Sequence, residues 1–253
     1  MAKYWEAVRV DGQDMQCYVS MPDAVDASPA VIVAMEAFGV NHHICDVADR
    51  LAKEGYVGIA PTLYHREGVE PQAREGSTPT YSYGTDDLSA RMAAMGNLDD
   101  DALIKDINAT ISYLETIPRV TRDNVGIVGF CVGGRIAYLA ATRCPDLKAA
   151  SVFYGGRISI PFGHGLAPIE LTDQINCPIL GHFGDLDQNP TPEEVSAIEA
   201  QLKDQSKVYD FKMYRNAGHG FFCDERDSYH ESSANDAWSR TLAWFDKYLK
   251  GQA

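Results

Sequence analysis

The sequence predicts an α/β fold with a mostly parallel sheet that is flanked by helices and preceded by an antiparallel hairpin. Short apolar, β-branched runs alternate with amphipathic stretches of helical period along most of the chain. This alternation is typical of a sheet covered by helices on both faces. The 253 residues contain no internal repeat and no low-complexity linker. We therefore expect one domain that covers residues 1–253.

Each element is predicted from a local pattern. The first two strands flank Asp11-Gly12, a dipeptide typical of hairpin turns. The later strands are apolar runs, as expected of strands buried on both faces. One helix begins with a threonine cap, a proline and two glutamates. In chain order we predict strands at 4–10, 15–20 and 30–35, a helix at 42–56, a strand at 56–64, a helix at 101–117, a strand at 124–130, a helix after Gly134, strands at 149–155 and 177–184, a helix at 191–204, a strand at 207–214 and a helix at 235–249.

The segment at about 64–101 departs from this rhythm. It contains turn formers, three tyrosines, several arginines and methionines, and it is too long for an ordinary connection. We interpret it as a lid-like insertion or a pocket wall. The alternative is a solvated excursion without a function.

Composition excludes several classes of protein. The 36 acidic and 22 basic residues give a net charge of −14, which repels nucleic acid and anionic lipid. No apolar stretch approaches the roughly 20 residues of a membrane helix, and the first residues do not resemble a signal peptide. We therefore expect a cytoplasmic protein with a small-molecule substrate, present as a monomer or small homo-oligomer. The six cysteines form no C-x-x-C pair, so free thiols are expected.

The most informative stretch is Gly129-Phe130-Cys131-Val132-Gly133, which joins a predicted strand to a predicted helix. This G-x-C-x-G pattern is the context of a nucleophile elbow, with cysteine in the position usually held by serine. The helix N-terminus behind the turn stabilises a thiolate and an oxyanion alike. Neither phosphate-loop pattern fits these residues. A buried structural cysteine is the alternative.

A nucleophile of this kind needs a carboxylate and a histidine that follow it in that order. Asp185 and Asp187 follow the strand at 177–184, and His219 follows the strand at 207–214. The ends of parallel strands meet at one edge of a sheet, so these side chains should lie near Cys131. We favour Asp187 as the partner of the histidine and expect Asp185 to shape the loop.

The remaining histidines lack such a setting. His42, His43 and His65 are candidates for the mouth of a pocket, whereas His164, His182 and His230 are expected to be structural or solvated. A metal site formed by His182 with the two aspartates has no third imidazole at ligand spacing, so we predict no metal site.

Four stretches together resemble the dienelactone hydrolases, also called carboxymethylenebutenolidases, a family with the α/β-hydrolase fold. They are "VIVAMEAFGVNHHICDVADRLAKEGYVGIAPTLY", "VGIVGFCVGG", "GDLDQNP" and "AGHGF". The resemblance covers nearly the whole chain. Its most specific feature is a cysteine elbow combined with the glutamate of "EAFGVN".

The resemblance implies roles for named residues. Cys131 would be the nucleophile of a lactone or ester hydrolase, His219 its base, Asp187 the residue that orients the base, and Glu36 the acceptor of the thiol proton when substrate binds. The backbone N–H groups of Val132 and Ala37 would form the oxyanion hole. A thioester would form and be hydrolysed without a metal or organic cofactor.

Substrate binding is less well defined by the resemblance. The candidates are Phe38, Tyr64, Tyr83 and Arg91. The family's arginine shortly after the histidine is absent here, with Cys223 near its place and Arg226 one helical turn further on. Two alternatives stay open, namely a hydrolase of other small esters and a reactive-cysteine sensor without turnover.

Overall fold

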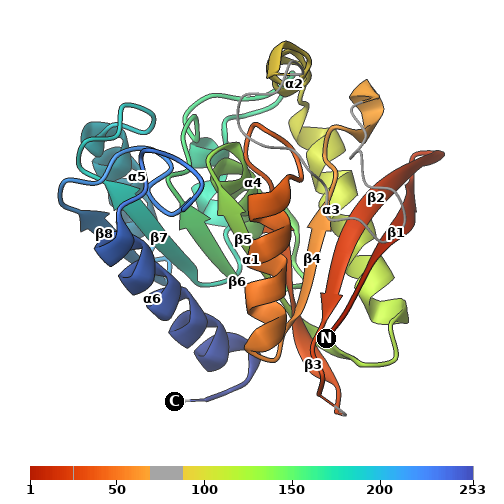
Figure 1. Cartoon of the computed structure of the whole chain (residues 1–253). Coiled ribbons are helices and arrows are strands. Elements are labelled where there is room, and N and C mark those ends of the chain that lie inside the picture. The colour runs from red at the N-terminus through yellow and green to blue at the C-terminus, as the bar shows by residue number, and fades with distance from the viewer. Residues whose placement is uncertain (25, 69–87, 253) are drawn as a thin grey trace.

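The computed structural model of the protein describes residues 1–24, 26–68 and 88–252 (Figure 1). Within these ranges, eight strands form one sheet in the order β1-β2-β4-β3-β5-β6-β7-β8. The strands are β1 (Ala2–Val10), β2 (Gln13–Met21), β3 (Ser28–Ala34), β4 (Val57–Pro61), β5 (Val120–Phe130), β6 (Leu147–Phe153), β7 (Ile179–Gly184) and β8 (Tyr209–Tyr214). The helices are α1 (His42–Lys53), α2 (Leu88–Gly96), α3 (Asp100–Thr116), α4 (Val132–Arg143), α5 (Pro192–Asp204) and α6 (Glu231–Leu249), with 3₁₀ turns η1 (His65–Glu67) and η2 (Pro168–Gln174).

The predicted fold class is confirmed. Strand β1 pairs with β2 around a turn in which Asp11 and Gly12 have φ angles of 49° and 81°, the left-handed region that this dipeptide tolerates. Strand β2 is antiparallel to β4. The strands β4, β3, β5, β6, β7 and β8, in the order in which they lie in the sheet, are parallel to one another. Parallel order places the carboxyl ends of β3, β5, β7 and β8 at one edge of the sheet.

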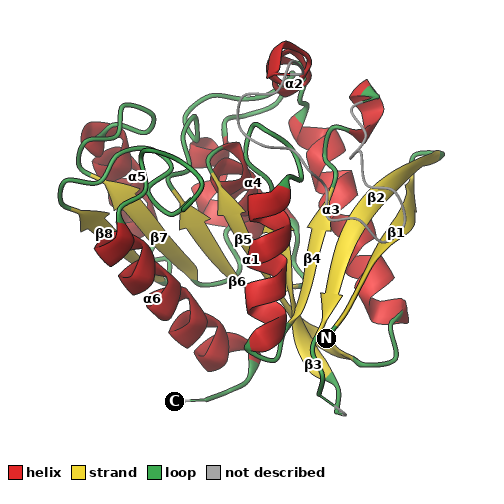
Figure 2. Cartoon of the chain, viewed as in Figure 1, coloured by secondary structure: helices red, strands yellow, loops and turns green. Residues whose placement is uncertain are grey.

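Helices cover both faces of the sheet (Figure 2). Helices α1 and α6 pack on one face, and α3 and α4 pack on the other. The strands between them are almost wholly buried and rich in valine, isoleucine and alanine. This two-sided burial explains why these strands have no alternation of polar and apolar residues.

The helix that follows the candidate nucleophile is fixed by a buried ion pair. The guanidinium of Arg135 in α4 donates to both carboxylate oxygens of Asp100 in α3, at 2.6 Å and 2.9 Å. Both residues are buried. A two-point contact of this kind restricts orientation as well as distance, so α3 holds the first turns of α4 in place.

Some boundaries differ from the prediction. Helix α2 lies in the segment interpreted as a lid, where we predicted no helix, although its leucine, alanine, methionine and arginine residues favour helix. Helix α6 begins at Glu231 rather than 235, since its first turn contains serines that we assigned to the preceding loop. Residues 69–87 of the predicted lid lie outside the described part of the chain.

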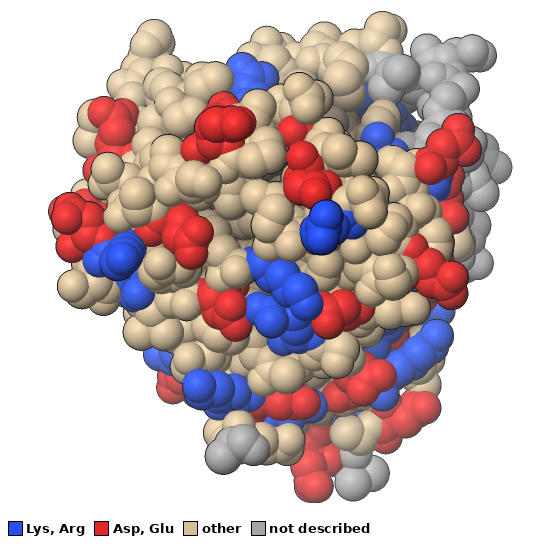
Figure 3. Space-filling model, turned by 90° about the vertical axis from the view of Figure 1, so that its left-hand side faces the viewer, with Lys and Arg blue, Asp and Glu red and all other residues tan. Residues whose placement is uncertain are grey.

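Two properties of the described helices and surface bear on possible partners. Within the described ranges, no helix combines the length and the apolar character that crossing a membrane requires. On the face shown in Figure 3, acidic and basic side chains are interspersed among uncharged residues. An anionic substrate would therefore depend on individual basic side chains near the site.

Candidate active site

Cys131 lies at the sharp turn between β5 and α4. Its φ and ψ angles are 58° and −120°, a strained conformation for a residue with a side chain. A Cβ at position 129 would lie 1.9 Å from the carbonyl oxygen of Gly133, and one at position 133 would lie 2.2 Å from the carbonyl oxygen of Ala34. Only glycine fits at these two positions. The predicted elbow therefore forms, and the Cys131 side chain stays partly exposed.

The close approach of Gly133 to Ala34 also explains the position of Glu36. The loop that leaves β3 starts beside the elbow and turns back at once, because the Gly39 N–H donates to the Glu36 carbonyl at 3.0 Å. Glu36 has no solvent exposure. A carboxylate buried so completely needs polar partners.

His219 and Asp187 meet at the edge of the sheet, as predicted. The Nδ1 atom of His219 lies 2.9 Å from Oδ2 of Asp187. The other carboxylate oxygen of Asp187 accepts the Asn189 N–H at 2.8 Å. Asp187 is buried, whereas the His219 side chain is 27% exposed. The arrangement holds the imidazole with one nitrogen on the carboxylate and leaves the other for chemistry.

The electrostatics of His219 favour its protonated form. Burial by itself lowers the pKa of His219, but hydrogen bonds to Asp187 and Cys131, together with the charge of Asp187 and of Cys131 when it is a thiolate, outweigh burial and raise the pKa to about 10. The pKa of His219 thus depends on both the Asp187 carboxylate and the Cys131 side chain. The structure brings these three side chains into one hydrogen-bonded group.

Asp185 has a different environment from Asp187. Its Oδ1 atom accepts the Asn216 N–H at 2.7 Å, and its own N–H donates to the Tyr214 carbonyl at 3.0 Å. Asp185 therefore connects the loop after β7 to the loop after β8. This geometry matches the loop-shaping role that we predicted for it.

Tyr154 and Arg226 are partners of Glu36 that the sequence analysis did not predict. The Tyr154 hydroxyl donates to Oε1 of Glu36 at 3.4 Å, and Nη1 of Arg226 lies 3.6 Å from the same oxygen. Sequence reasoning missed Tyr154, which follows β6 directly and also packs edge-on against His219 at a ring separation of 5.1 Å. Its position at a strand end is the signal that could have revealed it.

The expected oxyanion-hole residues lie on either side of the elbow. Val132 is the first residue of α4, so its N–H has no acceptor within the helix. Ala37 lies in the loop after Glu36, and the Tyr64 hydroxyl donates to its carbonyl oxygen at 3.0 Å. Tyr64 is buried and fixes the orientation of this loop.

The candidates for substrate binding have different surroundings. Arg91 is buried and its guanidinium donates to the Phe38 carbonyl. Arg226 is more exposed, at 25% for its side chain, and lies over the Phe38 ring with 5.5 Å between its guanidinium carbon and the ring centre. Tyr83 lies outside the described residues. Arg226 is therefore a basic side chain, among the described residues, that contacts Glu36 of the candidate site.

The histidines proposed for a pocket mouth are dispersed. His42 is exposed and pairs with Glu225, whereas His43 is buried near Glu36. His65 is also buried and lies 3.2 Å from Asp106, so the expectation of a pocket-mouth position is wrong for His65.

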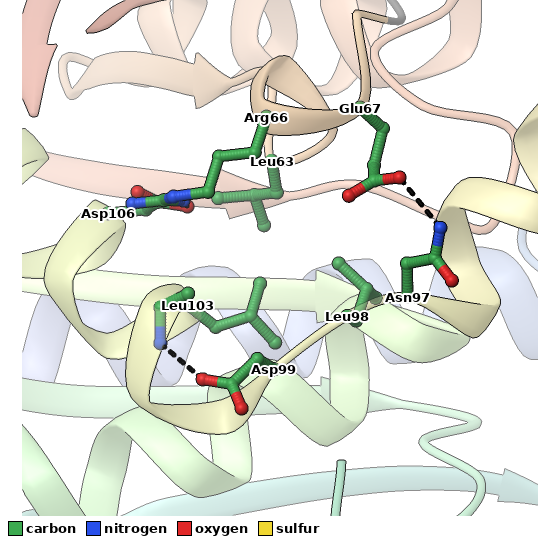
Figure 4. A pocket seen from close by; sticks show the side chains of 9 residues that line it. Leu63, Arg66, Glu67, Asn97, Leu98, Asp99, Leu103 and Asp106 are labelled. Carbon is green, nitrogen blue, oxygen red and sulfur yellow. Dashed lines mark hydrogen bonds and ion pairs between the residues drawn. The ribbon is translucent and has the colours of Figure 1, made fainter. Parts of the chain in front are cut away.

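A small pocket lies between η1, α2 and α3, partly within the predicted lid segment (Figure 4). Its polar side chains are largely paired with one another. Arg66 donates to Asp106 at 2.6 Å, and Asn97 donates to Glu67 at 2.7 Å. The lining residues are Leu63, Arg66, Glu67, Asn97, Leu98, Asp99, Ala102, Leu103 and Asp106. No candidate catalytic residue is among these described lining residues.

Comparison with known proteins identifies the family. The sequence profile of the dienelactone hydrolase family matches residues 15–249. The chain is 38% identical over 248 residues to a "Putative carboxymethylenebutenolidase" of Synechocystis sp., covering 96% of each chain. It is 32% identical over 254 residues to a "Probable 2-oxo-3-(5-oxofuran-2-ylidene)propanoate lactonase" of Bradyrhizobium sp., covering 100% of this chain and 97% of the relative.

A solved structure gives the same result at the level of the fold. A crystal structure titled as a "Putative Dienelactone Hydrolase" from Klebsiella pneumoniae matches with a TM-score of 0.83 and 32% identity, covering 98% of this chain and 99% of that one. The sequence match, the order of the strands in the sheet and the elbow between β5 and α4 all indicate the same family. The chain therefore belongs to the dienelactone hydrolase family and is a hydrolase of lactones or esters.

Proposed function

We propose that the protein hydrolyses a small unsaturated lactone or activated ester that carries a carboxylate, with Cys131 as nucleophile and a thioester intermediate. The observation that carries the proposal is the group formed by Cys131, His219 and Asp187 beside the buried carboxylate of Glu36. The Bradyrhizobium relative supports this substrate class, because its name describes a lactone ring attached to a propanoate.

In the first half of the reaction, Glu36 takes the proton of the Cys131 thiol. The thiolate attacks the carbonyl carbon, and the resulting oxyanion accepts hydrogen bonds from the N–H groups of Val132 and Ala37. The carbon–oxygen bond to the ring or alkoxy oxygen then breaks. That oxygen leaves as an enolate or alkoxide and takes the proton that Glu36 received from Cys131, which restores the Glu36 carboxylate, and the acyl group remains on sulfur as a thioester.

In the second half, water attacks the thioester. Sulfur carries the acyl group at this stage, so no thiolate raises the pKa of His219, and the imidazole takes a proton from this water while Asp187 stabilises the imidazolium that forms. The carbon–sulfur bond breaks, the carboxylic acid is released, and the imidazolium of His219 returns its proton to the Cys131 sulfur. A thiolate attacks well and a thiol attacks poorly, so the transfer to Glu36 decides when the enzyme is active.

Arg226 gives a physical reason why substrate controls this transfer. In the structure its guanidinium lies 3.6 Å from the Glu36 carboxylate. A substrate carboxylate near Arg226 competes for the same positive charge. Glu36 then loses part of its stabilisation as an anion and becomes a better proton acceptor for Cys131.

The enzyme proposal is tested by turnover of 4-nitrophenyl acetate and of an enol-lactone that bears a carboxylate. We expect hydrolysis of both compounds, faster for the lactone because its carboxylate competes with Glu36 for Arg226, and a transient acyl adduct on Cys131 detectable by mass spectrometry. Rapid alkylation of Cys131 without hydrolysis of either compound would instead favour the sensor without turnover.

Replacing Glu36 by glutamine tests the proton acceptor. Glu36→Gln should lower kcat/KM by about 10²- to 10⁴-fold, the usual contribution of a positioned general base. An unreactive carboxylate analogue that leaves the sulfur accessible should speed alkylation of Cys131 by iodoacetamide in the native protein and not in the variant. Steady-state rates and alkylation rates are the measurements.

Glu67→Gln is the matched control for this change, because Glu67 pairs with Asn97 at the surface, at the separate pocket. Its rates should equal those of the native protein. Native turnover in Glu36→Gln would refute control through Glu36 while leaving Cys131, His219 and Asp187 as a possible triad.

Replacing Arg226 tests recognition of the substrate carboxylate. Arg226→Ala should raise KM for the carboxylate-bearing lactone about 10-fold or more, since a charge-assisted contact contributes about 1.5–3 kcal/mol. The KM for 4-nitrophenyl acetate should change much less. Arg91→Ala is the comparison: a buried guanidinium bonded to the Phe38 carbonyl should affect both substrates alike. Equal losses on both substrates in Arg226→Ala would argue for a structural role of Arg226.

A further inference from the structure

A second group of potential ligands lies directly beside Glu36. The carboxylate of Glu36, the imidazole of His43 and the thiol of Cys223 lie with their ligand atoms within 4.8 Å of one another. They come from the loop after β3, from the first turn of α1 and from the loop between β8 and α6. All three residues are buried. Chain segments far apart in sequence thus converge on one small volume.

His43 is the unusual member of this group. Among the residues that the structure describes, neither ring nitrogen of His43 has a hydrogen-bond partner, although the residue is only 1% exposed. Its ring packs against Phe130 and Phe222, with ring centres 5.8 Å and 5.9 Å away. Both ring nitrogens thus lie in a buried setting with no described partner, and an imidazole in this setting can offer a nitrogen to a ligand.

The two segments that carry His43 and Cys223 are held together by ion pairs. Arg50 in α1 donates to Asp224 at 3.0 Å, and His42 pairs with Glu225. Asp224 is the residue next to Cys223, and His42 is the residue next to His43. The backbone around the group is thus fixed before any ligand binds, which reduces the entropic cost of binding.

We propose that Glu36, His43 and Cys223 form a binding site for a divalent transition-metal ion of the Zn²⁺ type, with water at the fourth position. Thiolate, imidazole and carboxylate are the three side-chain ligands that Zn²⁺ takes, at bond lengths of about 2.0–2.3 Å. Tetrahedral coordination at these lengths separates ligand atoms by about 3.4–3.6 Å. The ligand atoms of the three side chains lie within 4.8 Å of one another, so movements of about 1 Å bring them to the tetrahedral spacing. Binding exchanges the Cys223 thiol proton, which passes to solvent, for the metal ion.

The charges of the site favour a dication. Glu36 and a Cys223 thiolate contribute two negative charges, and Zn²⁺ supplies two positive ones. The ion replaces Arg226, now 3.6 Å from Glu36, as the partner of that carboxylate. Bound metal keeps Glu36 from accepting the Cys131 proton and so inhibits hydrolysis. The inhibition, unlike the binding itself, rests on the proposed function of Glu36.

Binding is tested with Co²⁺ and Zn²⁺ on the Cys131→Ala protein, which lacks the thiol of the candidate active site. Co²⁺ should give a sulfur-to-metal charge-transfer band that Zn²⁺ abolishes by displacement. The band should persist when Cys177→Ala is added and disappear when Cys223→Ala is added. His43→Asn should weaken Zn²⁺ binding at least about 10-fold in competition with a chelating dye. Circular dichroism establishes that each variant is folded.

Several outcomes would overturn the site. If Co²⁺ gives no charge-transfer band with the Cys131→Ala protein, Cys223 is excluded as a ligand. The same conclusion follows if the band persists after Cys223→Ala is added. Unchanged affinity in folded His43→Asn excludes His43. If the site binds Zn²⁺ as expected and the native enzyme is not inhibited, the metal site stands and the proposed function of Glu36 fails.

Discussion

Cys131→Ala is expected to abolish hydrolysis of both the lactone and the aryl ester, to the rate of buffer alone. The alanine lacks the sulfur that would form the thioester, and no other side chain of the described site offers a nucleophile at the elbow. The fold should persist, because residue 131 is partly exposed and the turn conformation is imposed by its neighbours. Initial rates and a thermal melt measure the two properties.

Cys177→Ala is the matched control for the nucleophile. Cys177 is a free, buried cysteine just before β7. Its loss should lower stability slightly through the removed sulfur and leave kcat unchanged. Turnover that survives in Cys131→Ala would place the nucleophile elsewhere.

Asp187→Asn is expected to lower kcat by about 10⁴-fold, the effect of losing the carboxylate that orients a catalytic imidazole. The amide also removes the charge of Asp187, which is one of several contributions that raise the pKa of His219 to about 10. The pKa of His219 should therefore fall in the variant, and NMR titration of the imidazole measures this shift. Kinetics and titration together separate a loss of orientation from a loss of folding.

Asp185→Asn tests the choice between the two neighbouring acids. Asp185 accepts the Asn216 N–H at 2.7 Å, and an amide oxygen can still accept this bond. We expect a change in kcat of less than about 10-fold and an unchanged His219 pKa. A larger loss in Asp185→Asn than in Asp187→Asn would reverse the assignment.

Much of this site could be predicted because its residues lie at the ends of parallel strands. Cys131 follows β5 directly, and Asp187 and His219 lie three and five residues after β7 and β8; parallel order brings such ends together. The glycines around Cys131 indicate the sharp turn from the sequence alone. Local pattern was sufficient for these residues.

The partners of Glu36 could not be predicted in this way. Arg226 reaches it from a long loop between β8 and α6, and no local pattern defines the path of such a loop. The position of Tyr154 at the end of β6 indicates the correct edge of the sheet, but its φ angle of 38° is a conformation that its residue type does not indicate. Helix α2 was missed because turn formers before it masked its favourable composition.

The packing around the elbow separates the architecture of the site from its chemistry. Gly129 and Gly133 have no room for another atom, whereas the side chain between them is partly exposed. The backbone would therefore present serine as readily as cysteine. A serine hydroxyl is far too weak an acid to give its proton to a carboxylate, so the control attributed to Glu36 and Arg226 depends on sulfur. In the proposed mechanism a serine at this position would depend on His219 alone as its base, so a single sulfur atom is what would allow the carboxylate of a substrate to set the rate of its own hydrolysis.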